Sequence, residues 1–530
     1  MAHKVIIADP LSAEGLSPLL EARDIELIIL DEVEPEERAA ILNEAHALIV
    51  RSRTKVTKDL LEAMPHLMVI GRAGVGIDNI DVEAATARGV IVLNAPDGNT
   101  IAASEHTMAM MLALIRHIPF AHQTVKNGGW QRERFIGIQL AHKTLGIVGL
   151  GRIGQEVAKR ARAFDMHIIA YDPFLTEERA RALHIEKVSL PELYTRSDLI
   201  TIHTPLTAET RGLIDRQAFS QMRNGVRIIN CARGGIIDED ALLEALESGK
   251  VAGAALDVFA EEPPQNRALI EHPRLIVTPH LGASTVEAQT LVARDVAFEV
   301  LHVLRQEPFQ NSVNFPSLPK DMLERLKHDL ALAEWLGRLA SQLARSAPKE
   351  LSIQYAGAYR REDQAALSRA LVMSVLREQL DVHVNFVNAF YLAKERALTI
   401  QEETSSKSEG FERKITVRLT CEGGTFVSLS GTVLNGLGPR LVRIDDNSVD
   451  WAPTPYTLYV HHQDRPGVIG RVGTMLGSHG INIATMQVGR RGEGGPAIML
   501  IAVDERPDQD VLSRLTTLPE IERVQLLVEA

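Results

Sequence analysis

The sequence predicts an α/β protein made of two parallel-sheet lobes, followed by two smaller α+β domains. Short β-rich runs alternate with helical patterns over residues 1–98, and the same alternation returns after Lys143. Such alternation is typical of parallel sheets covered by helices. Residues 457–530 instead follow the order strand, helix, strand, strand, helix, strand, which is ferredoxin-like. A chain of 530 residues is also too long for one hydrophobic core, so several domains are expected.

The first lobe is expected to begin with a series of short strands. These strands are predicted at residues 5–8, 25–30, 47–50, 67–71 and 90–93. A long helix should follow, capped by Thr100 and reaching Arg116, before Pro119 stops it.

The second lobe is expected to open at Lys143. Its strands are predicted at residues 144–148, 167–171, 199–201, 227–230, 251–256 and 275–278. A helical stretch at 285–305 then leads back toward the first lobe. We therefore expect a discontinuous first lobe wrapped around the second, with a ligand cleft between them.

Linkers rich in proline suggest the remaining boundaries. Pro316 and Pro319 mark one linker, and the dipeptides Ala452-Pro453 and Thr454-Pro455 mark another. The resulting division has a first lobe at 1–98 completed by 283–314, a second lobe at 99–282, an α+β domain at 315–452 and a ferredoxin-like domain at 456–530. The first two are expected to be Rossmann-like or flavodoxin-like, and a helix at 322–345 should open the third.

Composition excludes several classes of function. The net charge of −12 argues against nucleic acid or an acidic membrane surface as the main partner. The presence of only Cys231 and Cys421 excludes a disulfide framework and a cysteine-rich metal site, and we expect no metal. The apolar stretch at 101–119 contains Glu105, His106 and Arg116, so it predicts a buried helix and no membrane span. With a strand-like start and no apolar leader, the chain is expected to be cytoplasmic.

A glycine fingerprint, GLGRIG, indicates a dinucleotide site. Gly149 permits a tight turn, Gly151 allows the backbone to approach a pyrophosphate, and Gly154 allows close packing of helix on strand. The amide groups at the start of the following helix would face the phosphates. A second pattern, Gly436-Leu437-Gly438, runs into Pro439 and lacks the third glycine, so we give it little weight.

The strand after the fingerprint helix ends at Tyr171-Asp172-Pro173. Asp172 is therefore placed to accept hydrogen bonds from ribose hydroxyl groups. Because a carboxylate there would repel the 2′-phosphate of NADP, the sequence favours NAD as cofactor.

A trio of polar residues downstream of the fingerprint suits oxidation of a 2-hydroxy acid. His280 can take the hydroxyl proton, and an acid near it would favour the charged imidazole. Arg233 offers a planar fork for a carboxylate. By composition alone Glu261 and Glu262 are equally good acids, a single histidine among 18 is weak evidence, and Arg233 could simply belong to a turn.

Four segments resemble the D-isomer-specific 2-hydroxyacid dehydrogenase family over roughly residues 1–312. They are GLGRIG, CARGGIIDE, LDVFAEEPP and TPHLGAST, in the family's order. The resemblance implies that Arg233, Glu262 and His280 are catalytic, and it selects Glu262 over Glu261. It also implies a substrate-binding first lobe and an NAD-binding second lobe. The cofactor contacts that it implies, beyond the glycines and Asp172, are Arg152, Ile153, Thr204, Cys231, Ala232, Asp257, Gly282, Ala283 and Val75.

Within that family, the front segments RSRTKV, GRAGVGIDNIDV and NAPDGNTIAASEHT resemble members that oxidise 3-phosphoglycerate with NAD, the first step of the phosphorylated route to serine. This likeness places Arg51, Ser52 and Gly74 at the substrate, together with Arg233, and implies that backbone amides near Gly74 help to hold the carboxylate. The phosphate requires local cations in so acidic a chain. The candidates, which the sequence does not rank, are Arg51, Arg53, Arg72, Arg132 and Arg134.

The C-terminal segment LYVHHQDRPGVIGRVGTMLGSHGINIATMQVGR resembles an ACT domain, a ligand-sensing module. Similar serine-sensing modules imply that His462, Asp464 and Asn482 bind L-serine, which would inhibit the enzyme by feedback. The alternative is a dimerising domain that binds nothing. Residues 315–452 resemble the intervening regulatory domain of long-form relatives, and the family likeness implies a homotetramer.

Two other functions remain open at this point. The same chemistry would serve a hydroxypyruvate or glyoxylate reductase or another D-2-hydroxyacid reductase, although an amino-acid sensor has no obvious use there. A non-enzymatic NAD-sensing scaffold could also retain Arg233, Glu262 and His280.

Overall fold

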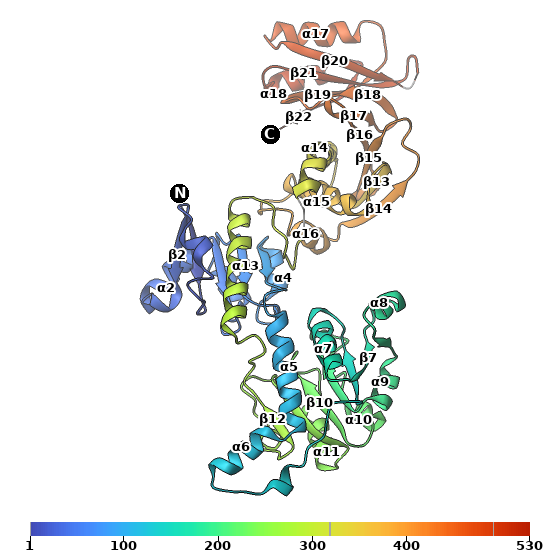
Figure 1. The fold of residues 1–530 in the computed structure, drawn as a ribbon. Helices are drawn as coiled ribbons and strands as arrows, with labels where there is room; N and C mark the ends of the chain where they lie inside the picture. The colour runs from blue at the N-terminus through green and yellow to red at the C-terminus, as the bar shows by residue number, and fades with distance from the viewer. Residues whose placement is uncertain (1, 317–319, 491, 530) are drawn as a thin grey trace.

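The computed structural model describes residues 2–316, 320–490 and 492–529, and it confirms the predicted fold class. Four sheets follow one another along the chain (Figure 1). Pro316 is described, whereas Pro319, the second proline of the expected linker, lies outside the described residues.

The first sheet is parallel, with the strand order β2-β1-β3-β4-β5. Its strands are β1 (His3–Ile7), β2 (Ile25–Ile29), β3 (Ala47–Val50), β4 (Val69–Arg72) and β5 (Ile91–Asn94). The nearby helices are α1 (Ser17–Leu20), α2 (Pro35–Asn43), α3 (Lys58–Glu62), α4 (Val82–Ala87) and α13 (Val286–Leu304). As expected for the stretch at 285–305, α13 returns from the second lobe to the first (Figure 1). It packs on β4 and buries its apolar residues in the core of this lobe.

The second sheet is also parallel, with the order β12-β11-β10-β9-β6-β7-β8. Its strands are β6 (Thr144–Val148), β7 (His167–Tyr171), β8 (Glu186–Lys187), β9 (Leu199–Ile202), β10 (Val226–Asn230), β11 (Val251–Leu256) and β12 (Leu275–Val277). Strand order reverses at β6, because β7 pairs with one side of it and β9 with the other. Open α/β sheets bind ligands at such a point, beyond the carboxyl ends of the strands.

The helices of the second lobe are α5 (Thr100–Ile115), α6 (Ile118–Lys126), α7 (Arg152–Ala163), α8 (Glu177–Ala182), α9 (Leu190–Arg196), α10 (Arg216–Gln221), α11 (Glu239–Glu247) and α12 (Arg267–Ile270). The expected cap of α5 is wrong: Thr100 is the first helical residue, and Asn99 occupies the cap position. The helices α5 and α13 connect the two lobes (Figure 1). Within the described ranges, none combines the length and apolar character that crossing a bilayer requires.

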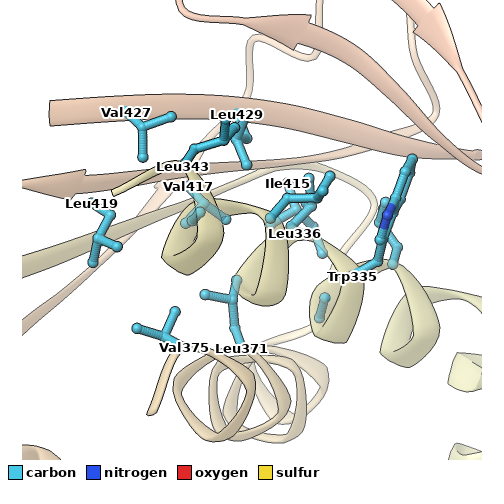
Figure 2. Close-up of a cluster of buried hydrophobic side chains, with 14 of the residues drawn as sticks. Trp335, Leu336, Leu343, Leu371, Val375, Ile415, Val417, Leu419, Val427 and Leu429 are labelled. Atoms are coloured by element: carbon cyan, nitrogen blue, oxygen red, sulfur yellow. The ribbon is translucent and has the colours of Figure 1, made fainter. Parts of the chain in front are cut away.

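The third domain contains a mixed sheet with the order β14-β13-β15-β16-β17-β18. Its elements are α14 (Lys320–Leu343), β13 (Pro348–Gly357), α15 (Arg361–Arg377), α16 (Ala389–Glu395), β14 (Thr399–Ser405), β15 (Arg413–Cys421), β16 (Phe426–Leu434), β17 (Gly438–Ile444) and β18 (Asn447–Trp451). Helix α14 packs between the sheet and α15 through buried Leu336, Leu371 and Val417 (Figure 2). The glycine pattern at 436–438 is the turn between β16 and β17.

The fourth domain is an antiparallel sheet with the order β20-β21-β19-β22. Its elements are β19 (Tyr456–Gln463), α17 (Val468–Ser478), β20 (Ile483–Arg490), β21 (Pro496–Val503), α18 (Gln509–Thr516) and β22 (Ile521–Val528). This is the predicted strand and helix order. The third and fourth domains share one core, because Leu500 and Leu527 belong to the same buried cluster as Trp335 and Trp451.

Candidate active site

A cleft of about 600 Å³ lies between the first two lobes, at the carboxyl ends of the strands of the second sheet. Both lobes line it, so a bound ligand would contact both. The predicted site residues that line the cleft are Val75, Gly151, Arg152, Ile153, Thr204, Cys231, Ala232, Arg233, His280, Gly282 and Ala283. The structure thus brings together residues that are widely separated in the sequence.

The fingerprint turn has the close approaches that its glycines were predicted to allow. Gly149 has φ +91°, and a Cβ added there would lie 2.7 Å from the carbonyl oxygen of His203. A Cβ on Gly154 would lie 2.3 Å from the carbonyl oxygen of Gly149, whereas a Cβ on Gly151 would meet nothing within 4 Å. Helix α7 starts at Arg152 with no side-chain cap, so its first amide groups are available to an anion.

Several buried polar atoms that line the cleft lack a hydrogen-bond partner within the described ranges, which indicates a surface for a ligand. Among the described residues, Oδ1 of Asn99 and Oγ1 of Thr100 and Thr204 are buried and make no hydrogen bond. Buried polar groups are normally paired, so these atoms fit a polar ligand such as a dinucleotide. The sequence did not single out Asn99 or Thr100 for this role.

Asp172 follows β7 and does not line the cleft itself. Its Oδ2 accepts a hydrogen bond from the Leu150 amide at 2.8 Å, and its Oδ1 accepts one from the Phe174 amide at 2.8 Å. The side chain therefore fixes the fingerprint turn to the end of β7. Each carboxylate oxygen can accept a further hydrogen bond, so the predicted ribose contact remains compatible with this geometry.

His280 and Glu262 form the predicted pair. Nδ1 of His280 donates to Oε2 of Glu262 at 2.9 Å, and both side chains are partly exposed. Burial raises the pKa of Glu262, but hydrogen bonding and attraction to His280 outweigh it, so this pKa lies below its ordinary value. Among the described residues, Nε2 of His280 has no protein partner, which leaves it available to a substrate hydroxyl group.

Asp257 lies beneath the catalytic turn. Its carboxylate is fully buried and accepts hydrogen bonds from the amides of Leu281 and Gly282 at 2.7 and 2.8 Å. The Thr278 hydroxyl donates to it at 2.6 Å, and Nε2 of His106 lies 3.2 Å away. Asp257 therefore holds the segment that carries His280, and its predicted contact with the cofactor would come in addition to these bonds.

The other histidine that lines the cleft has a different environment. Burial lowers the pKa of His203 to about 4, and its Nε2 lies 3.0 Å from the Thr201 hydroxyl. His203 is therefore neutral at pH 7 and is less suited than His280 to carry a proton. Burial also raises the pKa of the Cys231 thiol to about 12, so Cys231 stays protonated and unreactive.

Arginines from both lobes gather at the substrate end. Arg233 follows β10, and its Nη1 donates to the Ala232 carbonyl oxygen at 2.6 Å. Arg72 ends β4. Like Arg51, it is not among the residues that line the cleft, but its buried Nε has no partner among the described residues. Burial, together with the positive charges of Arg233 and Arg51, lowers the pKa of Arg72 to about 10. This group of arginines attracts a ligand that carries more than one negative charge.

The remaining candidates for the phosphate are less suitable. Arg53 already pairs with Asp9 and Asp31. Arg132 and Arg134 are exposed in a short helical turn and do not line the cleft of their own chain, so they could reach a substrate only if a partner subunit presents them. Ser52 is exposed and does not line the cleft either.

The backbone near Gly74 differs in one respect from the expectation. The Gly74 amide donates to the Arg72 carbonyl oxygen at 2.8 Å, so it is not available to a carboxylate. Within the described chain, the amides of Val75 and Gly76 donate to no protein acceptor. These two amides, one and two residues further along, are the available donors.

Comparison with known proteins supports the same assignment. Residues 108–282 match the family model of the D-isomer specific 2-hydroxyacid dehydrogenase, NAD binding domain. Residues 325–445 match the D-3-phosphoglycerate dehydrogenase intervening domain, and residues 456–520 match the ACT domain. D-3-phosphoglycerate dehydrogenase from Bacillus subtilis (strain 168) is 46% identical over 524 residues, covering 99% of each chain. The enzyme of that name from Methanocaldococcus jannaschii is 42% identical over 525 residues, again covering 99% of each.

The chain belongs to the D-3-phosphoglycerate dehydrogenase family. Its first two lobes also resemble the crystal structure of NAD-dependent formate dehydrogenase from Staphylococcus aureus in complex with NAD. That likeness has a TM-score of 0.54 and 33% identity, and covers 59% of this chain and 99% of that one. The NAD binding domain and the NAD-bound neighbour identify NAD as the cofactor, so this family member is an NAD-dependent oxidoreductase.

The ACT domain of this family member does not bring the predicted serine residues together. Asp464 follows β19 and accepts a hydrogen bond from Arg490, whereas Asn482 precedes β20 and donates to Asp504 at 2.6 Å. The strands β19 and β20 run in the same direction, so these two residues lie at opposite ends of the sheet. His462 is only 1% exposed, and its Nε2 has no partner in the described part of the chain.

Sequence reasoning missed several residues that support the substrate end. Asp9 is 2% exposed and accepts hydrogen bonds from the Arg51 amide at 2.5 Å and the Thr54 hydroxyl at 2.6 Å. Asn79 donates to the carbonyl oxygens of Arg51 and Thr54 at 2.7 and 2.6 Å. Together they fix the loop after β3. A polar residue directly after a buried strand is the signal that could have identified Asp9.

Proposed function

We propose that the protein oxidises 3-phospho-D-glycerate to 3-phosphohydroxypyruvate with NAD, the first step of the phosphorylated route to L-serine. The observation that carries the choice of substrate is the buried Nε of Arg72, which has no partner among the described residues and lies in the field of Arg51 and Arg233. A substrate with both a phosphate and a carboxylate would neutralise the positive charge of these three arginines. The names of relatives that cover 99% of the chain agree.

The cleft suits the cofactor. The amides at the start of α7 would hold the phosphates, and Asp172 would contact the ribose. Further contacts would come from the oxygens of Asn99, Thr100 and Thr204 that have no partner in the described part of the chain. NAD, when bound, accepts the hydride from the carbinol carbon. Arg233 and the Val75 and Gly76 amides would orient the substrate carboxylate.

His280 would act as the base. Its Nδ1 is held by Glu262, so Nε2 takes the proton of the substrate hydroxyl group as the carbinol carbon loses hydride. Glu262 remains ionised and stabilises the imidazolium that forms. In the reverse direction, His280 returns that proton to the carbonyl oxygen.

The enzymatic test is formation of NADH from NAD and 3-phosphoglycerate by the full-length chain, with the product identified as 3-phosphohydroxypyruvate. Turnover that depends on 3-phosphoglycerate supports the proposal. If only unphosphorylated 2-hydroxy acids react, the chain is a general D-2-hydroxyacid reductase. If no such substrate reacts although NADH binds, the scaffold function gains support.

We also propose that L-serine inhibits the enzyme through the ACT domain. Asp464 and Asn482 are separated by the length of the eight-residue β20, roughly 25 Å, which is too far for one serine molecule. A serine site would therefore take Asp464 from one chain and Asn482 from a second chain. Such a site requires at least two associated chains. We propose a homotetramer in the cytoplasm as the working assembly.

The test of regulation is inhibition by L-serine in the wild type and in Asn482→Ala. The variant should lose inhibition and keep its uninhibited turnover, and Gln509→Ala, an exposed change in the same domain, should remain inhibited. If serine does not inhibit the wild type, the ACT domain serves association alone.

A further inference from the structure

Arg233 is held from across the cleft by an aspartate of the other lobe. Its Nε donates to Oδ2 of Asp78 at 3.0 Å, over a sequence separation of 155 residues. The Arg233 side chain is 26% exposed and the Asp78 side chain is 55% exposed, so the bond is shielded from water mainly on the arginine side. Asp78 follows β4 and lines the cleft.

The contacts of the guanidinium show what this bond does. Nη1 donates to the Ala232 carbonyl oxygen, so Asp78 and the chain's own backbone hold two of the three nitrogens. The third, Nη2, lies against Gly76, where an added Cβ would be only 1.9 Å away. Nη2 is therefore placed beside Gly76, whose amide, like that of the preceding Val75, has no protein acceptor within the described residues.

Asp78 also affects the charge of the site. Arg72 feels repulsion from Arg233 and Arg51, and among the groups that act on it Asp78 and Asp9 are the negative ones. The Asp9 carboxylate already accepts hydrogen bonds from the loop after β3. Asp78 thus offsets part of the positive charge before a substrate arrives and leaves Nη2 available.

We propose that Asp78 is a positioning residue, which holds Arg233 by Nε so that Nη2 meets the substrate carboxylate together with the Val75 and Gly76 amides. This inference rests on the proposed function, since it takes Arg233 to bind that carboxylate. Asp78 acts through Arg233 and does not itself touch the substrate. An aspartate fits the task because a carboxylate accepts a strong hydrogen bond from Nε.

A different role for Asp78 would be to tie the two lobes together without positioning Arg233. The chain offers a matched control, because Arg152 of the second lobe pairs with Asp97 of the first at 2.7 Å. Asp97→Ala removes an ion pair between the same lobes and leaves Arg233 untouched. A tether would make both substitutions equally harmful to substrate binding, whereas a positioning role would make only Asp78→Ala harmful.

The experiment is a calorimetric titration of 3-phosphoglycerate into the full-length enzyme saturated with NADH, a complex that cannot turn over. We expect Asp78→Ala to raise Kd about tenfold, Asp78→Asn to raise it less because the amide oxygen still accepts a hydrogen bond, and Asp97→Ala to change it less than about twofold. In an Arg233→Lys background, Asp78→Ala should cause no further increase in Kd, because the guanidinium that Asp78 orients is absent.

Two results would overturn the inference while leaving the proposed function intact. One is a Kd for Asp78→Ala within about twofold of the wild type or matched by Asp97→Ala. The other is an undiminished effect of Asp78→Ala in the Arg233→Lys background. If Arg233→Lys itself leaves Kd unchanged, the carboxylate role of Arg233 fails and this inference fails with it. Asp78→Asn keeps the shape of the side chain and serves if Asp78→Ala does not fold.

Discussion

Nδ1 of His280 lies 2.9 Å from Oε2 of Glu262, so the imidazole is held by one nitrogen and presents the other to the cleft. The buried carboxylate of Asp257 fixes the backbone on the other side of the same turn. His280 is thus oriented by its side chain and by its neighbours in the chain, which is the arrangement that a general base requires.

Replacement of His280 by Asn should remove the base and keep the cofactor site. We expect kcat to fall by about 10²–10⁴-fold, because proton transfer to a positioned side chain contributes that much. NADH affinity, measured by fluorescence titration, should stay within about threefold of the wild type. A comparable loss of NADH binding would contradict the role of His280 as base.

The adjacent acids Glu261 and Glu262 provide a matched pair of variants for testing the hydrogen bond to His280. Glu262→Gln removes the carboxylate beside His280, whereas Glu261→Gln changes an exposed neighbour. We expect kcat/KM to fall about 10–100-fold in the first variant and less than about twofold in the second, with the pH profile altered only in the first. Equal effects of the two substitutions would show that the hydrogen bond to His280 has no catalytic value.

Arg72 should decide between phosphorylated and unphosphorylated substrates. Arg72→Gln is expected to raise KM for 3-phosphohydroxypyruvate at least about tenfold and to change KM for hydroxypyruvate little, because only the former carries a phosphate. Arg53→Gln serves as the comparison, since Arg53 is already paired with Asp9 and Asp31. A larger increase in KM for Arg53→Gln than for Arg72→Gln would indicate that Arg53 binds the phosphate instead.

Asp172 should set the preference between the two nicotinamide cofactors. Asp172→Ala is expected to weaken NAD binding about tenfold and to relax the rejection of NADP, because the carboxylate that repels the 2′-phosphate is gone. The measurement is the ratio of kcat/KM for NADH and NADPH. An unchanged ratio would show that Asp172 does not contact the ribose and serves only to hold the turn through the Leu150 and Phe174 amides.

Asp9 should contribute stability that depends on pH. Burial raises the pKa of Asp9, but hydrogen bonds from Thr54, the Arg51 amide and Arg53 lower it by a larger amount. The folded-state pKa therefore lies below the ordinary value. The stabilisation is then present above the unfolded pKa of about 3.9 and is lost as pH falls through the lower folded value. Asp9→Asn should destabilise the chain by about 2 kcal/mol at pH 7.

Denaturant unfolding of wild type and Asp9→Asn at pH 7 and near pH 3 measures this effect. The difference between the two proteins should shrink at the lower pH. A difference that stays constant would mean that the ionised carboxylate is not what stabilises the loop after β3.

The sequence was sufficient for the fold class and for much of the cleft, for physical reasons. Hydrophobic period and glycine spacing depend on neighbours in the chain, so the sheets and the turn at Gly149 could be expected. The choice of Glu262 over Glu261 as the partner of His280 came from the family resemblance. Asp78 could not be expected, because its partner Arg233 is 155 residues away in the sequence and is brought close only by folding. The separation of Asp464 from Asn482 follows from the shared direction of β19 and β20, whereas the resemblance that suggested these residues gave no distance between them.

The central claim is that the arginines around Arg72 select a phosphorylated 2-hydroxy acid. The most direct measurement is kcat/KM for NADH oxidation with 3-phosphohydroxypyruvate and with hydroxypyruvate, on the same preparation of the full-length chain. We predict a preference for the phosphorylated substrate of at least about 100-fold, as expected for charge-assisted bonds to a phosphate. Equal values for the two substrates would contradict the claim and favour a general D-2-hydroxyacid reductase.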